Sequence, residues 1–323
     1  MESRPLATTG LTVTPIGIGL AALGRPAYIT PHRGGDLGAD RTEAAMRDRT
    51  HQMLDLATDL GVRYIDVARS YGLAELFLAG WLERHPSSEM TIGSKWGYRY
   101  VGGWQMDAPV HEVKDHSLSA LQTQWAESRR LLGGRLRLYQ IHSATPDTGV
   151  LDDGEVLAEL IRIGAEEGVV MGLTTSGSRQ AETVERALAA EVDGVNPFRQ
   201  VQATWNVLEP SAGGALQAAH QAGWGIMVKE SLANGRLAGA AAPPELAALA
   251  GDHGVGTDAV AIAAALAQPW VDTVLSGAVT PNQFRSNLDA AGLLLSQAEV
   301  ESLQPLATSP DVYWTARSAL DWS

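Results

Sequence analysis

Short apolar and β-branched runs alternate with longer amphipathic stretches along most of this chain, from about residue 50 onward. The runs predict strands over residues 13–18, 64–65, 91–95, 136–142, 169–174, 201–204, 225–229 and 271–276. The stretches between them predict helices over residues 43–60, 75–82, 118–132, 156–167, 181–190, 214–222, 259–267 and 281–291. Such alternation is typical of βα units around a parallel sheet. Seven clear strands and one weak strand suit an eight-stranded (α/β)8 barrel of the TIM type.

The 323 residues are predicted to form one domain, because no Pro/Ser-rich linker and no run of charge divides them. Residues 11–24 are apolar, but Pro15, Gly17 and Gly19 would interrupt the helix of a signal peptide, so we expect a hairpin that closes the bottom of the barrel. Two segments fall outside the βα repeat, the Gly-rich loop 24–40 and the tail 311–323, and we expect both near the barrel mouth. No apolar run approaches the roughly 20 residues that span a bilayer.

Composition narrows the class of protein. The formal net charge of −13 disfavours a surface for nucleic acid or anionic lipid, because these partners require clustered Lys and Arg. The absence of cysteine excludes disulfides, thiolate catalysis and Cys-ligated metal sites. His111 and His116 would not share one face of a helix, so no metal site is predicted there. We therefore expect a cytoplasmic protein with neither a nucleic-acid nor a membrane partner.

Four polar residues of different types, Asp66, Tyr71, Lys95 and His142, lie at or just after the ends of predicted strands. In a closed parallel barrel the carboxyl ends of the strands converge on one mouth, where residues distant in sequence meet. Each residue alone has an ordinary explanation, such as a helix cap, a turn, a solvated strand end or a buried histidine. All four at mouth positions together predict an assembled active site.

These four side chains suit proton transfer to a carbonyl oxygen. The phenol of Tyr71 has an ordinary pKa of about 10, and a neighbouring Lys95 ammonium would lower that pKa and make the phenol a usable acid. Asp66 would hold Lys95 charged, and a neutral His142 would hydrogen-bond the substrate oxygen. No amino-acid side chain supplies a hydride, so carbonyl reduction by this group requires a cofactor.

Several motifs resemble those of the aldo-keto reductase family. The run 61–75, GVRYIDVARSYGLAE, is similar to the family signature, with Asp66 ahead of Tyr71 and Glu75 soon after. Residues 92–95 resemble the strand of the catalytic lysine, and residues 138–142 resemble the strand of the catalytic histidine. The resemblance continues through residues 172–174, 201–202 and 277–287, so it covers nearly the whole chain in the right order.

The resemblance implies an (α/β)8 barrel that binds NADPH, or NADH, at its mouth and reduces an aldehyde or ketone, or catalyses the reverse oxidation. Tyr71 would be the general acid/base, Lys95 and Asp66 its tuning pair, and His142 the group that orients the substrate. The implied cofactor contacts begin at the nicotinamide and end at the adenosine: Thr174, Thr175, Gln202, Lys229, Ser231, Leu232, Asn234, Gly235, Gly277, Ala278, Gln283 and Asn287.

The adenosine end of this site has its own physical logic. Thr280 followed by Pro281 reads as an N-cap and a first helical residue, so free N–H groups would face an anion. Arg285, one turn further on, would reach a 2′-phosphate. However, Gly277 and Gln283 replace the family's usual basic residues, which weakens the preference for NADP over NAD.

Two further departures concern the nicotinamide. Thr174 and Thr175 replace a Ser-Asn pair that binds the carboxamide in the family, which keeps one hydroxyl and loses the amide. Lys229 stands where an aromatic residue usually stacks on the ring. We hypothesise that Lys229 favours the reduced cofactor unless the adjacent Glu230 neutralises it.

The substrate class and two other functions remain open. Aromatic residues of the loop after Lys95 and of the tail would suit an aromatic or sugar-derived carbonyl compound: Trp96, Tyr98, Tyr100, Trp104, Tyr313, Trp314 and Trp322. A Schiff-base aldolase or lyase that uses Lys95 or Lys229 is the first alternative function. A non-catalytic, nucleotide-sensing subunit is the second.

Overall fold

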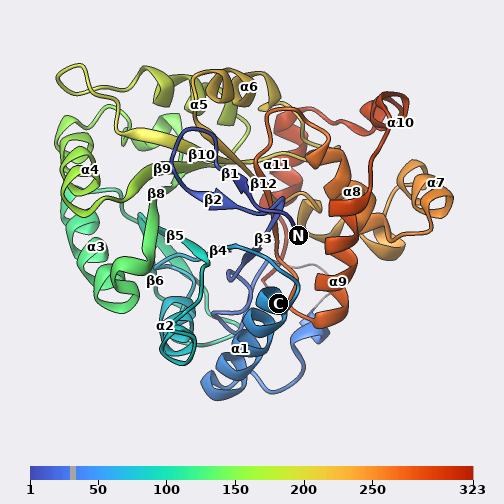
Figure 1. Cartoon of the computed structure of the whole chain (residues 1–323), viewed down its shortest axis with the longest axis horizontal. Helices are drawn as coiled ribbons and strands as arrows, with labels where there is room; N and C mark the ends of the chain where they lie inside the picture. Colours follow the sequence, from blue (N-terminus) through green and yellow to red (C-terminus); the bar gives the residue numbers. More distant parts are fainter. Residues whose placement is uncertain (30–33, 323) are drawn as a thin grey trace.

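A closed barrel of eight parallel strands forms the centre of the molecule, in the computed structural model that describes residues 1–29 and 34–322 (Figure 1). In hydrogen-bonded order the strands are β10 (Phe198–Thr204), β11 (Gly225–Lys229), β12 (Thr273–Ser276), β3 (Ile16–Gly19), β4 (Tyr64–Asp66), β5 (Thr91–Trp96), β8 (Leu136–Ala144) and β9 (Val170–Thr175). Each strand contains residues of one predicted run, and β9 pairs with β10 to complete the ring. The predicted (α/β)8 barrel is confirmed.

Helices surround the barrel, and all eight predicted helices form with ends displaced by at most two residues. They are α1 (Glu43–Asp59), α2 (Ala74–Arg84), α3 (Leu118–Leu132), α4 (Gly154–Glu167), α5 (Gln180–Ala189), α6 (Gly213–Gln221), α8 (Thr257–Leu266) and α9 (Pro281–Asp289). Further helices that we did not predict are α7 (Pro244–His253), α10 (Gln297–Ser302) and α11 (Pro310–Ser318). The first turns of α7 and α11 contain Pro244 and Pro310, a placement that favours helix starts, so the sequence did contain a signal for them.

The N-terminal hairpin covers the end of the barrel where the strands begin (Figure 1). It consists of β1 (Arg4–Pro5) and β2 (Thr12–Val13). Leu6 packs against Gly225 at the start of β11, and Arg4 Nε donates a 2.6 Å hydrogen bond to the carbonyl of Asp272, just before β12. The predicted position of this hairpin, residues 11–24, is wrong, because residues 16–19 within it pair in parallel with β12 and β4 as a barrel strand.

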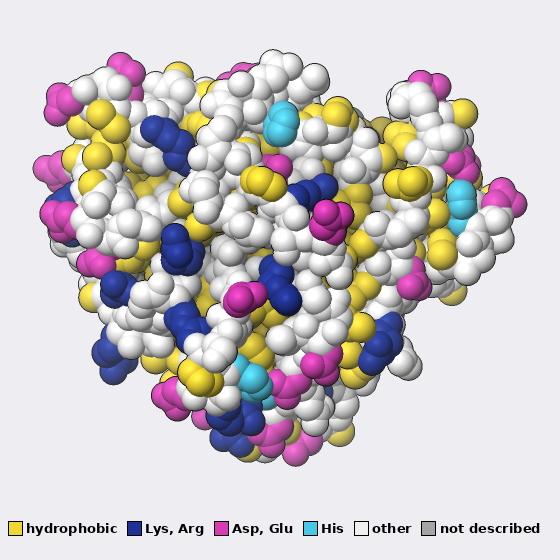
Figure 2. Space-filling view, viewed as in Figure 1, with side chains coloured by type: hydrophobic (Ala, Val, Ile, Leu, Met, Phe, Trp, Pro, Cys, Tyr) yellow, Lys and Arg dark blue, Asp and Glu magenta, His cyan; other side chains and the backbone are white. Residues whose placement is uncertain are grey.

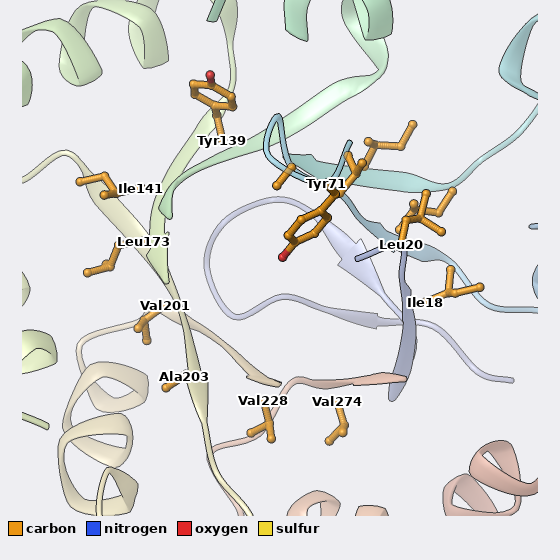
Figure 3. Close-up of a cluster of buried hydrophobic side chains, with 14 of the residues drawn as sticks. Ile18, Leu20, Tyr71, Tyr139, Ile141, Leu173, Val201, Ala203, Val228 and Val274 are labelled. Atoms are coloured by element: carbon orange, nitrogen blue, oxygen red, sulfur yellow. The ribbon is translucent and has the colours of Figure 1, made fainter. Parts of the chain in front are cut away.

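Strand side chains divide between the barrel interior and the outer surface that faces the helices. Figure 3 shows Ile141, Leu173 and Val201 on the outer side of the strands, whereas the ring of Tyr71 lies inside the ring of strands. The ring of Tyr64 fills the lower interior, where a Cβ on Gly93 would overlap its hydroxyl. Because the bottom is filled and covered, the mouth is the hollow end of the barrel.

Two additions to the βα repeat lie at the mouth. After β5 the chain forms an antiparallel hairpin of β6 (Tyr98–Tyr100) and β7 (Glu112–Lys114). Ile29, in the loop 24–40, forms an isolated antiparallel bridge with Trp322, in the tail 311–323. These two segments therefore meet, and residues 30–33 and 323, which belong to them, lie outside the described residues.

On the surface, acidic and basic side chains are interspersed over the face drawn in Figure 2. None of the described helices has the length and apolar character that crossing a bilayer requires.

Candidate active site

The loop that carries Tyr71 is held in place by the buried carboxylate of Glu75, at the start of α2. Its Oε1 accepts hydrogen bonds from Ser94 Oγ at 2.6 Å and Ser128 Oγ at 2.7 Å, and its Oε2 lies 2.7 Å from Arg69 Nη1. Ser94 belongs to β5 and Ser128 to α3. One carboxylate thus ties the Tyr71 loop to two neighbouring elements.

The four residues predicted to act in catalysis lie together at the mouth. Lys95 Nζ hydrogen-bonds to Asp66 Oδ2, to Tyr71 Oη at 3.2 Å and to the carbonyl of Val67 at 3.1 Å. The ring of His142 packs edge-to-face against Tyr71, with 5.4 Å between the ring centroids. Asp66, Tyr71, Lys95 and His142 are each at most 9% exposed. The arrangement aligns a phenol, an ammonium and a carboxylate in one desolvated row.

Burial determines the protonation states in this row. It raises the pKa of Tyr71 well above the usual value, and the nearby Asp66 raises it further, while Arg25 opposes both. We expected a lowered pKa for Tyr71 beside Lys95, but the net shift is upward, because the loss of solvent around the phenol dominates. Burial, assisted by Lys95, lowers the pKa of His142 well below its usual value. At neutral pH Tyr71 is therefore a protonated phenol and His142 a neutral imidazole.

A cavity of about 420 Å³ opens beside this group, with Asp66 and Tyr71 in its wall. Most residues predicted to contact the cofactor line the same cavity: Gln202, Lys229, Ser231, Leu232, Asn234, Gly235, Gly277, Ala278, Gln283 and Asn287. Residues from the ends of β10, β11 and β12 and from α9 thus share one hollow, although they are far apart in sequence.

The three residues predicted to contact the carboxamide, Thr174, Thr175 and Gln202, have different surroundings. Thr174 and Thr175 are fully buried and are not among the described residues that line the cavity. Thr174 Oγ1 accepts a 2.7 Å hydrogen bond from the backbone N–H of Ser143. Gln202 does line the cavity, but its Nε2 donates to Asp66 Oδ1 at 2.9 Å. Gln202 therefore supports the Lys95–Asp66 pair.

Lys229 and Glu230 have separate partners. Lys229 Nζ donates to Thr204 Oγ1 at 2.9 Å, across the β10–β11 pair. Arg317, on α11, binds Glu230 with Nε 3.0 Å from each carboxylate oxygen. The backbone of Glu230 has a φ of 54°, a conformation that costs energy for a residue with a Cβ. The tail helix is therefore docked onto the cavity wall through an ion pair.

At the far side of the cavity, the start of α9 has the predicted cap. Thr280 Oγ1 accepts a hydrogen bond from the N–H of Gln283 at 3.4 Å, and Pro281 occupies the first turn. Gln283 Nε2 donates to Asp36 Oδ2 at 2.7 Å. Arg285 is exposed and is not among the described cavity residues, so the structure does not place it where we expected a 2′-phosphate contact.

A carboxylate is the charged group on this side of the cavity. Asp258 lines the cavity and accepts a 2.9 Å hydrogen bond from Ser286 Oγ. The amide of Asn287 lies between Asp258 Oδ2, at 2.7 Å, and Ser276 Oγ, at 2.8 Å. Among the described cavity residues, Lys229 is the only Lys or Arg, and it lies with the Tyr71 group at the strand ends.

The aromatic residues predicted to form a substrate pocket have several different environments. Trp96 is fully buried in the core, and Trp104 packs edge-to-face on Phe77. Tyr98 packs against His142 with 5.0 Å between centroids. Trp322 stacks on His111 at 4.3 Å, and both line a second, wider hollow together with Tyr98. Only part of the predicted aromatic set therefore faces the region beside His142.

The other aromatic residues of that set hold the segment after β5 and the C-terminal tail in place. Tyr313 is buried, and its hydroxyl accepts a 3.0 Å hydrogen bond from Asn206 Nδ2. The ring of Trp314 lies beneath Lys229, with Nζ 5.9 Å from its centroid. The hydroxyl of Tyr100 accepts a hydrogen bond from the N–H of Trp104 at 3.2 Å.

Arg25 is a site residue that sequence reasoning missed. Its side chain is 2% exposed and pairs with Glu112 at 2.8 Å. Its guanidinium lies 5.2 Å from the ring of Tyr71 and 4.8 Å from the rings of Tyr28 and Trp322. The only sequence signal was its place in the Gly-rich loop 24–40, which did not single it out. Arg25 links the loop, the β6–β7 hairpin and the tail beside Tyr71.

Comparison with known proteins agrees with this geometry. The Aldo/keto reductase family matches residues 15–307, so the chain belongs to that family. It is 25% identical to the uncharacterized oxidoreductase YqkF of Bacillus subtilis, over 98% of this chain and all of that one. It is 26% identical to D-threo-aldose 1-dehydrogenase of a Pseudomonas species, over 89% of this chain and 92% of that one.

A solved structure shares the fold. Aldo-keto reductase AKR11C1 of Bacillus halodurans, in its holo form, superposes with a TM-score of 0.71 at 22% identity, over 96% of this chain and 97% of that one. The sequence resemblance to aldo-keto reductases is thereby confirmed, and the relatives are oxidoreductases.

Proposed function

We propose that this protein is a nicotinamide-dependent carbonyl reductase that converts an aldehyde or ketone to an alcohol, or catalyses the reverse oxidation. The observation that supports this most directly is the protonated phenol of Tyr71, in the wall of a deep cavity and hydrogen-bonded to the buried Lys95–Asp66 pair. Family membership supports the same class of chemistry.

In the proposed reduction, Tyr71 donates its proton to the carbonyl oxygen as negative charge develops there. Lys95, 3.2 Å away, stabilises the phenolate that remains, and Asp66 and Gln202 hold Lys95 in position. The neutral imidazole of His142 donates a hydrogen bond to the same oxygen and orients the substrate. A bound reduced dinucleotide would supply the hydride to the carbonyl carbon.

The cavity has the features that a dinucleotide requires. The turn after β11 contributes Ser231, Asn234 and Gly235 to the wall, and Asn234 has the left-handed φ of 58° that lets the backbone turn there. The start of α9, where Asn282 and Gln283 line the cavity, presents the positive end of the helix, which suits an anion. We therefore propose that the pyrophosphate follows this turn and that the adenosine lies near α9.

The charges of the cavity wall are the basis on which we propose a preference between NADH and NADPH. The resemblance implies NADPH, but the described wall near α9 contains the carboxylate of Asp258 and the amide of Gln283 instead of a cation. A 2′-phosphate beside a carboxylate is electrostatically unfavourable. We propose that NADH binds at least as tightly as NADPH.

Asp258→Asn is expected to tighten NADPH binding by about three- to tenfold relative to NADH, because one negative charge is removed while the bonds to Ser286 and Asn287 keep a partner. Fluorescence titration with each dinucleotide measures both affinities. Asp252→Asn, at an exposed position of α7, is the matched control and should change neither. An unchanged ratio in Asp258→Asn would count against a charge-based preference.

The substrate is proposed to be a sugar-derived or aromatic carbonyl compound. Tyr98, His111 and Trp322 line the second hollow, and Tyr98 also packs on His142. Sugar rings and aromatic rings both pack favourably on aromatic side chains. The name of the relative D-threo-aldose 1-dehydrogenase adds support for an aldose.

The Schiff-base alternative would rest on Lys229. Lys95 makes three hydrogen bonds to Asp66, Val67 and Tyr71, so its amine is not available to attack a carbonyl. Lys229 donates a hydrogen bond to Thr204 and faces the cavity. Borohydride trapping of substrate on Lys229 would favour this alternative over hydride transfer.

One experiment tests the proposed function. The purified chain is titrated with NADH and NADPH, and oxidation of the dinucleotide is then followed by absorbance with a panel of sugar and aromatic aldehydes. Turnover with at least one aldehyde is expected. Binding without turnover across the panel would instead favour the nucleotide-sensing subunit, and the absence of binding would contradict both.

A further inference from the structure

The ammonium of Lys229 places a positive charge in the wall of the cavity that also contains Tyr71. It ends β11, faces the cavity, and its Nζ bonds to the neutral hydroxyl of Thr204 at 2.9 Å. The ring of Trp314 closes the other side, with its centroid 5.9 Å from Nζ. Neither the hydroxyl nor the aromatic ring carries a formal negative charge that would form an ion pair with the ammonium.

The acidic neighbours of Lys229 are already paired. Glu230, the next residue, is bound by Arg317 through two 3.0 Å contacts. Asp66 is bound by Lys95 in a pair that is almost completely buried. Each of these pairs is close to neutral as a whole, so the net charge of this end of the cavity comes from Lys229. Glu230 therefore forms its ion pair with Arg317, and it does not neutralise Lys229 in the way that would have removed the preference for the reduced cofactor.

The reacting part of a cofactor must lie near this charge, by the proposed function on which this inference rests. Proton and hydride go to adjacent atoms of one carbonyl group, so a hydride donor must lie beside Tyr71. Lys229 shares the cavity wall with Tyr71 and interacts electrostatically with Lys95, Asp66 and His142. The nicotinamide ring is neutral when reduced and positive when oxidised.

We propose that Lys229 is a redox-state discriminator: its ammonium makes the protein bind the reduced dinucleotide more tightly than the oxidised one. The repulsion acts only on the oxidised ring. It therefore raises the ratio of the oxidised to the reduced dissociation constant without requiring a contact to the reduced ring. A consequence is rapid release of the oxidised product, which favours operation as a reductase.

The preference for the reduced dinucleotide should weaken as the pH rises. Burial lowers the pKa of Lys229 to about 8, with Arg317 and Lys95 acting in the same direction and Glu230 and Asp66 opposing. His142 is neutral at these pH values because burial holds its pKa well below the usual range. Below pH 8 Lys229 is charged and discriminates, and above it the charge and the discrimination are lost.

The test compares dissociation constants of NAD⁺ and NADH, and of NADP⁺ and NADPH, by tryptophan fluorescence at a pH one to two units below 8. The ratio of oxidised to reduced dissociation constants is expected to be about tenfold higher in wild type than in Lys229→Met. Lys229→Arg keeps the charge and should keep most of the ratio. Lys114→Met, at an exposed lysine outside the cavity, should leave it unchanged.

A second measurement follows the same ratio as a function of pH. In wild type the same ratio should fall as pH rises through about 8, whereas in Lys229→Met it should be flat. Equal ratios in wild type and Lys229→Met, or a wild-type ratio that does not change with pH, would overturn this inference while leaving the proposed function intact. If neither dinucleotide binds the wild-type protein, the proposed function itself is overturned, and this inference with it.

Discussion

Tyr71→Phe is expected to lower kcat for carbonyl reduction by about 10²- to 10⁴-fold, the usual contribution of a positioned general acid. The phenol of Tyr71 is hydrogen-bonded to Lys95 and lines the cavity, and phenylalanine removes its proton while keeping its shape. The ring still fills the space between Arg25 and His142, so dinucleotide affinity should change little. Steady-state kinetics and fluorescence titration on the same samples separate the two effects.

Tyr100→Phe is the matched control for this prediction. It removes a phenol whose oxygen is bonded to the N–H of Trp104 in the loop after β5, outside the described cavity wall. Its kcat should stay within about twofold of wild type, because the change removes one part-buried hydrogen bond within that loop and leaves the phenol of Tyr71 in place. If Tyr71→Phe retained wild-type kcat, Tyr71 would not be the acid, and the proposed proton path would have to be abandoned.

Lys95→Met is expected to reduce the free energy of unfolding by about 3–5 kcal/mol and to abolish turnover. The side chains of Lys95 and Asp66 are 0% and 4% exposed, and removal of one member leaves the other as an uncompensated buried charge. Gln202 and Tyr64 would remain as neutral donors to Asp66, at 2.9 and 3.3 Å, which is weaker compensation than an ammonium. Urea denaturation measures the loss of stability.

The double variant Asp66→Asn with Lys95→Met distinguishes the structural from the chemical effect. It removes both charges, so much of the lost stability should return, because neutral replacement of a buried pair is far less costly than breaking it. Activity should not return, because the phenolate of Tyr71 would have no ammonium beside it. Recovery of turnover in the double variant would show that the pair is only structural.

The barrel was predictable from the sequence because its strands are read from local pattern. Each apolar run places alternate side chains on the helix-facing surface, as Ile141, Leu173 and Val201 are placed in the structure. The meeting of Asp66, Tyr71, Lys95 and His142 followed from the same pattern, since the carboxyl ends of parallel strands converge. Neither inference required knowledge of which side chains touch.

The hairpin position and the tail helix were harder to predict for a local reason. Residues 12–13 and 16–19 form two short strands separated by a few residues, and only pairing with β12 and β4 assigns the second one to the barrel. The helix α11 is stabilised by contacts of Arg317 and Tyr313 with residues far back in the chain. Apart from Pro310 at its start, the apolar pattern of these nine residues is too weak to predict a helix, because so short a helix depends on tertiary contacts.

The sequence by itself determined the class of fold and the four-residue group at the mouth, and most of the cofactor contacts that it predicted do line the cavity. Only the tertiary structure decided which charges cancel: Glu230 pairs with Arg317 and not with Lys229, Gln202 supports Asp66, and Arg25 lies against Tyr71. The physical reason is that strand ends are specified by local periodicity, whereas ion pairs and pKa shifts depend on burial and on distances between elements that only the packed chain brings together.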